Sequence, residues 1–149
     1  MATTVTDANL TVTITDNVTL NGQSYGNTNT LTVGSVDEVY SRVVEVPTGA
    51  FTPVLELGTT GQGSVIAANV KYIRVTNLDN SAAVNLKVFG TDAMVINLEA
   101  GKSFILGGVN FDAAAVDIAQ GAVSHNTSFI ISAEALVTAC DIEVFAASI

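Results

Sequence analysis

The stretch that decides the fold of this chain begins with Val70-Lys-Tyr-Ile-Arg-Val-Thr-Asn77 and ends at Leu106. Three further runs follow the first: Ala83-Val-Asn-Leu-Lys-Val-Phe89, Ala93-Met-Val-Ile-Asn-Leu-Glu99 and Lys102-Ser-Phe-Ile-Leu106. Every run is rich in β-branched and aromatic residues, and Asn, Asp, Gly or Ala-Gly breaks separate the runs. This pattern predicts four short strands arranged as an antiparallel meander.

The tightest turn of this predicted meander is Glu99-Ala-Gly-Lys102. Gly101 suits such a turn because glycine takes a positive φ without steric cost. Residues two apart in a strand lie on the same face. In each run we expect one of the two faces to point towards the core, and one apolar residue can represent that face. These inner residues are Ile73, Leu86, Ile96 and Phe104.

The N-terminal region has the same two-residue alternation. Leu10, Val12 and Ile14 alternate with threonines, which is typical of a half-buried strand. Because the polar side of this strand carries hydroxyl groups rather than charges, it can lie against another protein surface without desolvating ions. We interpret residues 1–16 as an N-terminal strand or arm and residues 17–149 as a β-sandwich domain.

A hairpin is predicted directly after this strand. Val18–Leu20 is followed by Asn21-Gly22, the dipeptide most typical of a two-residue β-turn. The return segment, residues 23–29, is poor in apolar residues. We therefore expect it to be an edge or surface loop that leads to a strand near residues 30–33.

Further strand patterns complete the chain. We expect the first, at residues 38–47, to be covered on both sides for part of its length, because both of its faces carry apolar groups. Residues 112–118 have helical spacing and predict one short helical turn. With about ten short strands and no βαβ alternation, the sequence predicts an all-β, antiparallel β-sandwich that is jelly-roll-like. The remaining predicted strands are 54–57, 128–133 and 140–146.

Length and charge restrict the function. The 149 residues suffice for one domain with a core. A net charge of −9 with five scattered basic residues argues against nucleic-acid binding, which needs clustered Lys and Arg. No apolar run reaches about 18 residues, and the start lacks the basic and apolar regions of a secretory signal. We therefore expect no membrane partner.

No residue pattern predicts catalysis, a cofactor or a structural metal. His125 lies in a polar turn without a nucleophile motif, and one His with one Cys cannot close a zinc site. Cys140 has no second cysteine to pair with, and we expect it to be a small buried residue in a late strand. The Gly-rich residues 58–64 match no phosphate-binding fingerprint and predict a flexible connector. We expect a protein that is not an enzyme.

Two binding functions remain open from these residues. Asn77, Asp79 and Asn80 share one loop and could serve calcium, although their spacing does not match an EF-hand. A carbohydrate-binding module is the other alternative. It is weakened by the lack of Trp and by the presence of only three Tyr, because sugar sites stack on aromatic rings.

Three stretches resemble small structural proteins of tailed-phage virions, particularly those of marine phages and cyanophages. One is the Thr-rich N-terminal strand that runs into Leu20-Asn-Gly-Gln-Ser-Tyr25-Gly26-Asn-Thr28. The others are Val70-Lys-Tyr-Ile-Arg-Val-Thr-Asn-Leu-Asp79 and Leu98-Glu-Ala-Gly-Lys-Ser-Phe104. Together they span most of residues 10–106. These stretches are structural rather than catalytic, and the resemblance does not extend past residue 107.

The resemblance implies a β-sandwich virion component, namely a capsid decoration (cement) protein that bridges major capsid subunits and stabilises the shell. It implies a homo-oligomer, often a trimer, that is assembled in the host cytoplasm and lies on the capsid exterior. The major capsid protein and further copies of this chain would be its partners. A tail, fibre or head–tail connector component is the alternative within the same class.

Two sets of residues are the candidates for the interface of such a protein. The N-terminal strand could pair with a neighbour by β-addition through Leu10, Val12 and Ile14. The second set holds most of the scarce positive charge, which an acidic chain could use against carboxylates of a partner or of a copy. This set is Lys71, Arg74, Lys87 and Lys102.

Overall fold

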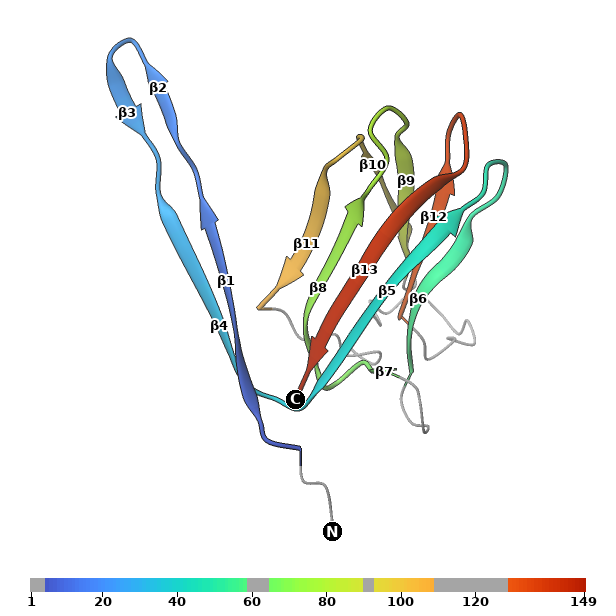
Figure 1. The fold of residues 1–149 in the computed structure, drawn as a ribbon, viewed down its shortest axis with the longest axis horizontal. Coiled ribbons are helices and arrows are strands. Elements are labelled where there is room, and N and C mark those ends of the chain that lie inside the picture. Colours follow the sequence, from blue (N-terminus) through green and yellow to red (C-terminus); the bar gives the residue numbers. More distant parts are fainter. Residues whose placement is uncertain (1–4, 59–64, 90–92, 109–128) are drawn as a thin grey trace, which may run out of the picture.

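A computed structural model of the chain describes residues 5–58, 65–89, 93–108 and 129–149, and all regular elements in these ranges are β-strands (Figure 1). The predicted all-β class is confirmed. The predicted helical turn at 112–118, His125 and most of the Gly-rich connector lie outside the described residues. The strands are β1 (Ala8–Thr15), β2 (Val18–Leu20), β3 (Gln23–Tyr25), β4 (Thr28–Val36), β5 (Glu38–Val46), β6 (Thr52–Gly58), β7 (Val65–Ile66), β8 (Val70–Asn77), β9 (Val84–Phe89), β10 (Ala93–Leu98), β11 (Ser103–Gly107), β12 (Phe129–Ala135) and β13 (Cys140–Ser148).

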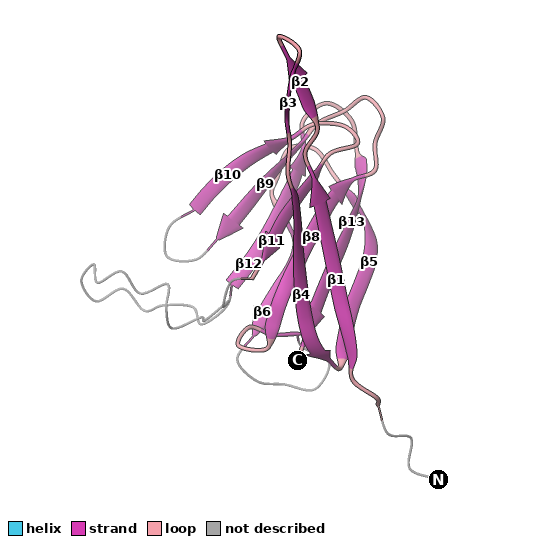
Figure 2. Ribbon diagram, turned by 90° about the vertical axis from the view of Figure 1, so that its left-hand side faces the viewer, coloured by secondary structure: helices cyan, strands magenta, loops and turns pink. Residues whose placement is uncertain are grey.

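Two sheets packed face to face form a sandwich (Figures 1 and 2). One has the strand order β11-β8-β13-β5, and the other has the order β10-β9-β12-β6-β7. Neighbouring strands run antiparallel, apart from the short parallel pair β6–β7. Apolar residues from the inner faces of both sheets form one core cluster, whose largest fully buried members are Leu57, Ile73, Leu86, Ile131 and Ile142.

The four strands predicted between residues 70 and 106 exist, but their predicted pairing as a meander is wrong. β9 pairs with β10, whereas β8 pairs with β11, and these two pairs belong to opposite sheets. The chain therefore crosses between the sheets after β8 and again after β10. The second crossing uses the predicted turn, in which Lys102 N–H donates to Glu99 O and Gly101 has a φ of 69°. Two strand pairs facing each other can bury both inner faces, which one flat meander cannot do alone.

Asn77, at the end of β8, joins the two sheets. Its side-chain amide is fully buried and donates to the carbonyl of Leu98 at the end of β10 (3.2 Å) and to that of Ala82 before β9 (2.9 Å). Its Oδ1 accepts a hydrogen bond from the backbone N–H of Asp79 (3.0 Å). One side chain thus satisfies three backbone groups where the chain passes from one sheet to the other.

The N-terminal part of the chain forms a long hairpin that projects beside the sandwich (Figure 1). β1 pairs with β4, and β2 pairs with β3 beyond them. We call residues 8–36 the arm, and its β2–β3 end the tip. The predicted turn at Asn21-Gly22 is confirmed, because both residues have positive φ (51° and 78°). The predicted boundary at residue 16 falls inside this hairpin, because the strand that ends near it pairs with β4.

The base of the arm packs on the outer face of the sheet β11-β8-β13-β5, where Val33 and Val36 are buried together with Tyr72 and Ala147. Leu10, Val12, Leu31 and Phe145 pack around this second, smaller cluster. At Gly107 of β11, a Cβ would lie 2.8 Å from a methyl group of Leu31, so glycine there lets the arm approach closely. Ser35, near the end of β4, has a φ of 57°, which non-glycine residues seldom adopt.

Two other sequence expectations need correction. The return limb of the tip is not a loop, because residues 23–25 form β3 and β4 begins at Thr28. These residues are poor in apolar groups because both faces of the limb are exposed. β5 is not covered on both sides, since Val39 and Val43 are exposed on its outer face. No described residue covers these two side chains enough to bury them, so this apolar surface stays in solvent.

We predict that Asn77→Ala destabilises the fold by roughly 2–4 kcal/mol, because two buried carbonyls and one backbone N–H lose their partner. Chemical denaturation in urea measures this loss. The matched control is Asn97→Ala, which removes an exposed hydrogen bond to Asn85 (3.0 Å) and should cost less than about 1 kcal/mol. Equal costs at the two positions would contradict the assigned role of Asn77.

Candidate interaction surface

The arm exposes more apolar side chains than a two-stranded hairpin needs. Val18, Leu20 and Tyr25 at the tip are 53–60% exposed, and Ile14 on β1 is 47% exposed. All residues of β2 and β3 are exposed, so nothing in the described chain covers the tip. An isolated two-stranded hairpin is only marginally stable in water. The tip is therefore the part of this surface that gains most from a partner.

One face of the arm is a ladder of threonines. The register places Thr11 opposite Thr32, Thr13 opposite Thr30, and Thr15 opposite Thr28. The last pair shares a hydrogen bond between hydroxyl groups (3.2 Å). Asp16 is the single charged residue between positions 8 and 36. Hydroxyl groups lose less hydration free energy than ions on burial, and this face can therefore be covered at low cost.

The predicted apolar interface residues of β1 divide into two groups. Leu10 and Val12 are half-buried, because they pack on the outer face of the protein's own sandwich. Ile14 lies past this contact and is exposed. The apolar face of β1 is thus used partly within the chain, and only its distal end is free to contact a partner.

The predicted basic residues do not form one patch. Arg74 lies on the outer face of the sheet β11-β8-β13-β5, where it forms an ion pair with Glu143 (2.6 Å) and lies over the ring of Phe145 (5.6 Å). Lys87 belongs to β9 in the other sheet, and its ammonium lies 5.5 Å from the ring centre of Phe51. Both cations therefore have partners within the chain.

The other two basic residues lie apart from these. Lys71 Nζ donates to the carbonyl of Ala68 (2.9 Å), and Lys102 is exposed in the turn between β10 and β11. Each of the four cations thus has its own surroundings. A partner that recognises a concentrated positive charge does not fit this distribution.

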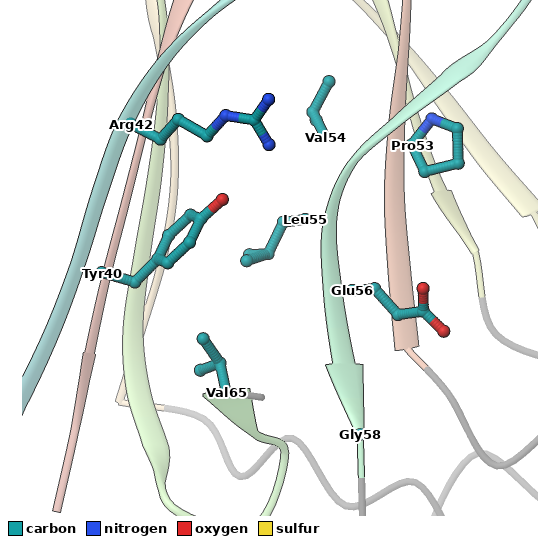
Figure 3. Close-up of a pocket in the computed structure, with 8 residues that line it drawn as sticks. All are labelled: Tyr40, Arg42, Pro53, Val54, Leu55, Glu56, Gly58 and Val65. Carbon is teal, nitrogen blue, oxygen red and sulfur yellow. The ribbon is translucent and has the colours of Figure 1, made fainter. Parts of the chain in front are cut away.

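The open edge between the sheets contains a cavity of about 330 Å³ (Figure 3). Tyr40 and Arg42 from β5 form one wall, and residues of β6 with Val65 of β7 form the opposite wall. The buried residues Val54, Leu55 and Val65 give this opposite wall an apolar surface. Neither Tyr40 nor Arg42 was predicted as a site residue. The sequence does contain one indication of this site: Arg42 lies on the same face of its strand as Tyr40 and Val44.

The loop proposed for calcium is occupied by its own hydrogen bonds. The amide of Asn77 is used in joining the sheets, and the carboxylate of Asp79 accepts bonds from the backbone N–H groups of Ser81 and Ala82 (both 2.7 Å). These bonds, first that from Ala82, lower the pKa of Asp79. Among the described residues, no group of three or more His, Cys, Asp or Glu side chains could hold a metal ion. Asp79 thus fixes the loop between β8 and β9.

Cys140 is a buried thiol at the start of β13, as predicted. Its Sγ–H donates to the carbonyl of Thr138 (3.2 Å). Burial, followed by the charges of Asp79 and Asp141, raises its pKa. Because the thiolate is the reactive form, the surroundings of Cys140 oppose nucleophilic chemistry.

No protein-family model, curated protein or solved structure matches this chain. No helix in the described ranges has the length and apolar character needed to span a membrane. The features of the molecule that bear on its function are the arm, the threonine ladder, the cavity and the arrangement of the strands.

We predict that the native Cys140 thiol reacts with Ellman's reagent roughly a hundred-fold more slowly than the same thiol in urea, because it is buried and held as the neutral thiol. The matched control moves the thiol by one position, to exposed Ala139, in the double variant Cys140→Ala/Ala139→Cys. That variant should react rapidly in the folded state. Rapid reaction of the native wild-type thiol would contradict the prediction.

We predict an acid-dependent contribution from Asp79. Its pKa is lowered in the folded protein, so its carboxylate stabilises the fold above the unfolded value of about 3.9 and loses this effect as the pH falls through the lower, folded value. The difference in melting temperature between wild type and Asp79→Ala should therefore be largest near neutral pH and shrink as the pH falls through this lower value. Asp7→Ala, at an exposed position, controls for net charge. A difference that does not change with pH would refute this role.

Proposed function

We propose that this chain is a non-enzymatic structural protein of a tailed-phage virion, and specifically a capsid decoration (cement) protein. It binds the major capsid protein and copies of itself on the capsid exterior, and it stabilises the shell by bridging subunits. The observation that carries this proposal is the projecting arm. Its tip exposes apolar side chains, and the threonine ladder along β1 and β4 gives it a face without charges. The resemblance of residues 10–106 to virion proteins supports the same assignment.

The arm suits a role in bridging subunits. Full burial of one exposed aliphatic or aromatic side chain contributes about 1.5–3 kcal/mol. Val18, Leu20 and Tyr25 are 53–60% exposed, so a partner can bury about half of each side chain, and together they contribute on the order of 3 kcal/mol per arm. That is weak for one contact in solution. It becomes effective in an oligomer, where several arms bind one surface and each raises the effective concentration of the next.

The strand order supports a jelly roll, which we propose as the specific form of this sandwich. Without β7, the eight body strands β5, β6 and β8–β13 can be counted in chain order from first to eighth. One sheet then has the order first, eighth, third, sixth, and the other has the order second, seventh, fourth, fifth. This arrangement agrees with the proposed jelly roll, an architecture found in viral capsid and lectin domains. The fold alone does not establish the function.

The charge of the chain agrees with a position outside the shell. A net charge of −9 disfavours contact with packaged DNA and suits an outer surface. The same arm would also serve a tail, fibre or connector component. The location of the bound copies separates these alternatives, because a decoration protein covers the shell whereas a connector forms one ring at a single vertex.

We predict that an arm without its tip no longer binds. Asp16 N–H donates to Asn27 O (2.8 Å), so the strands are still paired at this point. A variant in which Asn-Gly replaces residues 17–26 should close the hairpin there and retain the base of the arm. We expect a melting temperature within a few degrees of wild type, and loss of binding to shells assembled from the major capsid protein of the same genome. Electron microscopy of these shells measures the bound copies.

A triple substitution tests whether apolar contact is responsible. Val18→Thr, Leu20→Thr and Tyr25→Thr keep good strand formers at the tip and remove its apolar surface. The matched control places threonine at Met94, Val95 and Val137, which are exposed apolar residues of the sandwich. Binding should be lost in the tip variant and retained in the control. Full shell occupancy by either tip variant would overturn the proposed function.

A further inference from the structure

Arg42 lies on the inner face of β5, where a β-sandwich normally has an apolar residue. It lies opposite Val144 in the pairing of β5 with β13, between the pairs Tyr40–Ala146 and Val44–Ile142. The partners of all three on β13 are buried. In a sandwich, side chains on this inner face normally form the core. Arg42 instead extends its guanidinium into the cavity at the open edge of the sandwich (Figure 3).

Arg42 gains no partner from the fold at this position. Within the described ranges, its guanidinium forms no ion pair or hydrogen bond, and the same is true of the Tyr40 hydroxyl. Glu56 also lines the cavity, but its carboxylate points away from Arg42 (Figure 3). The cavity thus contains one guanidinium and one phenol that are available as hydrogen-bond donors.

The wall opposite these donors is apolar. Leu55 and Val65 face Tyr40 and Arg42 across the cavity (Figure 3), and both are buried. A volume of about 330 Å³ lies at the lower end of the range for small-molecule sites, which runs from about 300 to 1,000 Å³. Such a site suits a small ligand with a polar head and an apolar body.

We propose that this cavity is a binding site for a small monocarboxylate with an apolar body. The planar guanidinium of Arg42 matches a carboxylate in a two-bond arrangement, and the Tyr40 hydroxyl donates a further hydrogen bond. The apolar body packs on Leu55 and Val65. One positive charge balances one carboxylate, whereas a phosphate monoester would leave a second negative charge unpaired in an acidic protein. This binding site is independent of the proposed role of the arm.

Hexanoate is a suitable probe, and backbone amide shifts in ¹H–¹⁵N spectra of the full chain report where it binds. We expect saturable shifts at Tyr40, Leu55 and Val65, with a Kd in roughly the millimolar range for so few ligand atoms. 1-Hexanol has the same apolar chain without the charge and should bind about ten-fold more weakly or not at all.

Substitutions then identify the recognising groups. Arg42→Gln should weaken hexanoate binding about ten-fold or more, and Tyr40→Phe by a few-fold, while Lys102→Gln removes the same charge far from the cavity and should change nothing. If Arg42→Gln does not fold, the wild-type comparison of hexanoate with hexanol and the Tyr40→Phe variant still decide the question. Shifts that fail to saturate, equal binding of hexanol, or unchanged binding in a folded Arg42→Gln variant would each overturn the proposal.

Discussion

The sandwich depends on one buried amide, that of Asn77. A fully buried polar side chain is costly unless each of its groups is bonded, and here the amide bonds the chain on both sides of a sheet-to-sheet crossing. The end of β8 is thereby tied to the end of β10 in the opposite sheet. Apolar packing alone would allow the two sheets to slide relative to each other, because hydrophobic contact has no direction. The three hydrogen bonds of Asn77 remove that freedom where the two sheets are joined by only a short loop.

The sequence predicted the strands well and their neighbours poorly, and the reason is physical. Alternation along Val70–Asn77 identifies an inner and an outer face, but it contains no information about which strand lies beside it. The residues of β8 and β9 would show the same alternation in a meander and in two opposed sheets. The Asn21-Gly22 turn was predictable because its conformation is set by two adjacent residues. The pairings of β8 with β11 and β13 join residues far apart in the chain, so they follow from the closure of the whole core.

For the candidate surface, too, the sequence indicated the pattern of each strand but not how the strands are arranged. The alternating threonines of β1 indicated a strand with a polar, uncharged face, and β4 contains the same alternation at Thr28, Thr30 and Thr32. Their pairing into one ladder could not be read from either strand alone. Leu10 and Val12 were expected to contact a partner, yet they cover Tyr72 and Ala147, because a hairpin needs an anchor on its own body. The cavity at Arg42 lies between β5 and β6, which belong to opposite sheets. Its only indication in the sequence was that Arg42 shares a face of its strand with apolar residues.

The arm is attached at its base and free beyond it, which gives it the mechanics of a lever. From Val12, the last anchored residue of β1, to Leu20 at the tip, eight residues at about 3.3 Å each span roughly 25 Å. A turn of about 10° at the base would then move the tip by about 4 Å, a distance that follows from this rise per residue. On the shell that we propose as its partner, one sequence could in this way reach binding positions that differ slightly in angle.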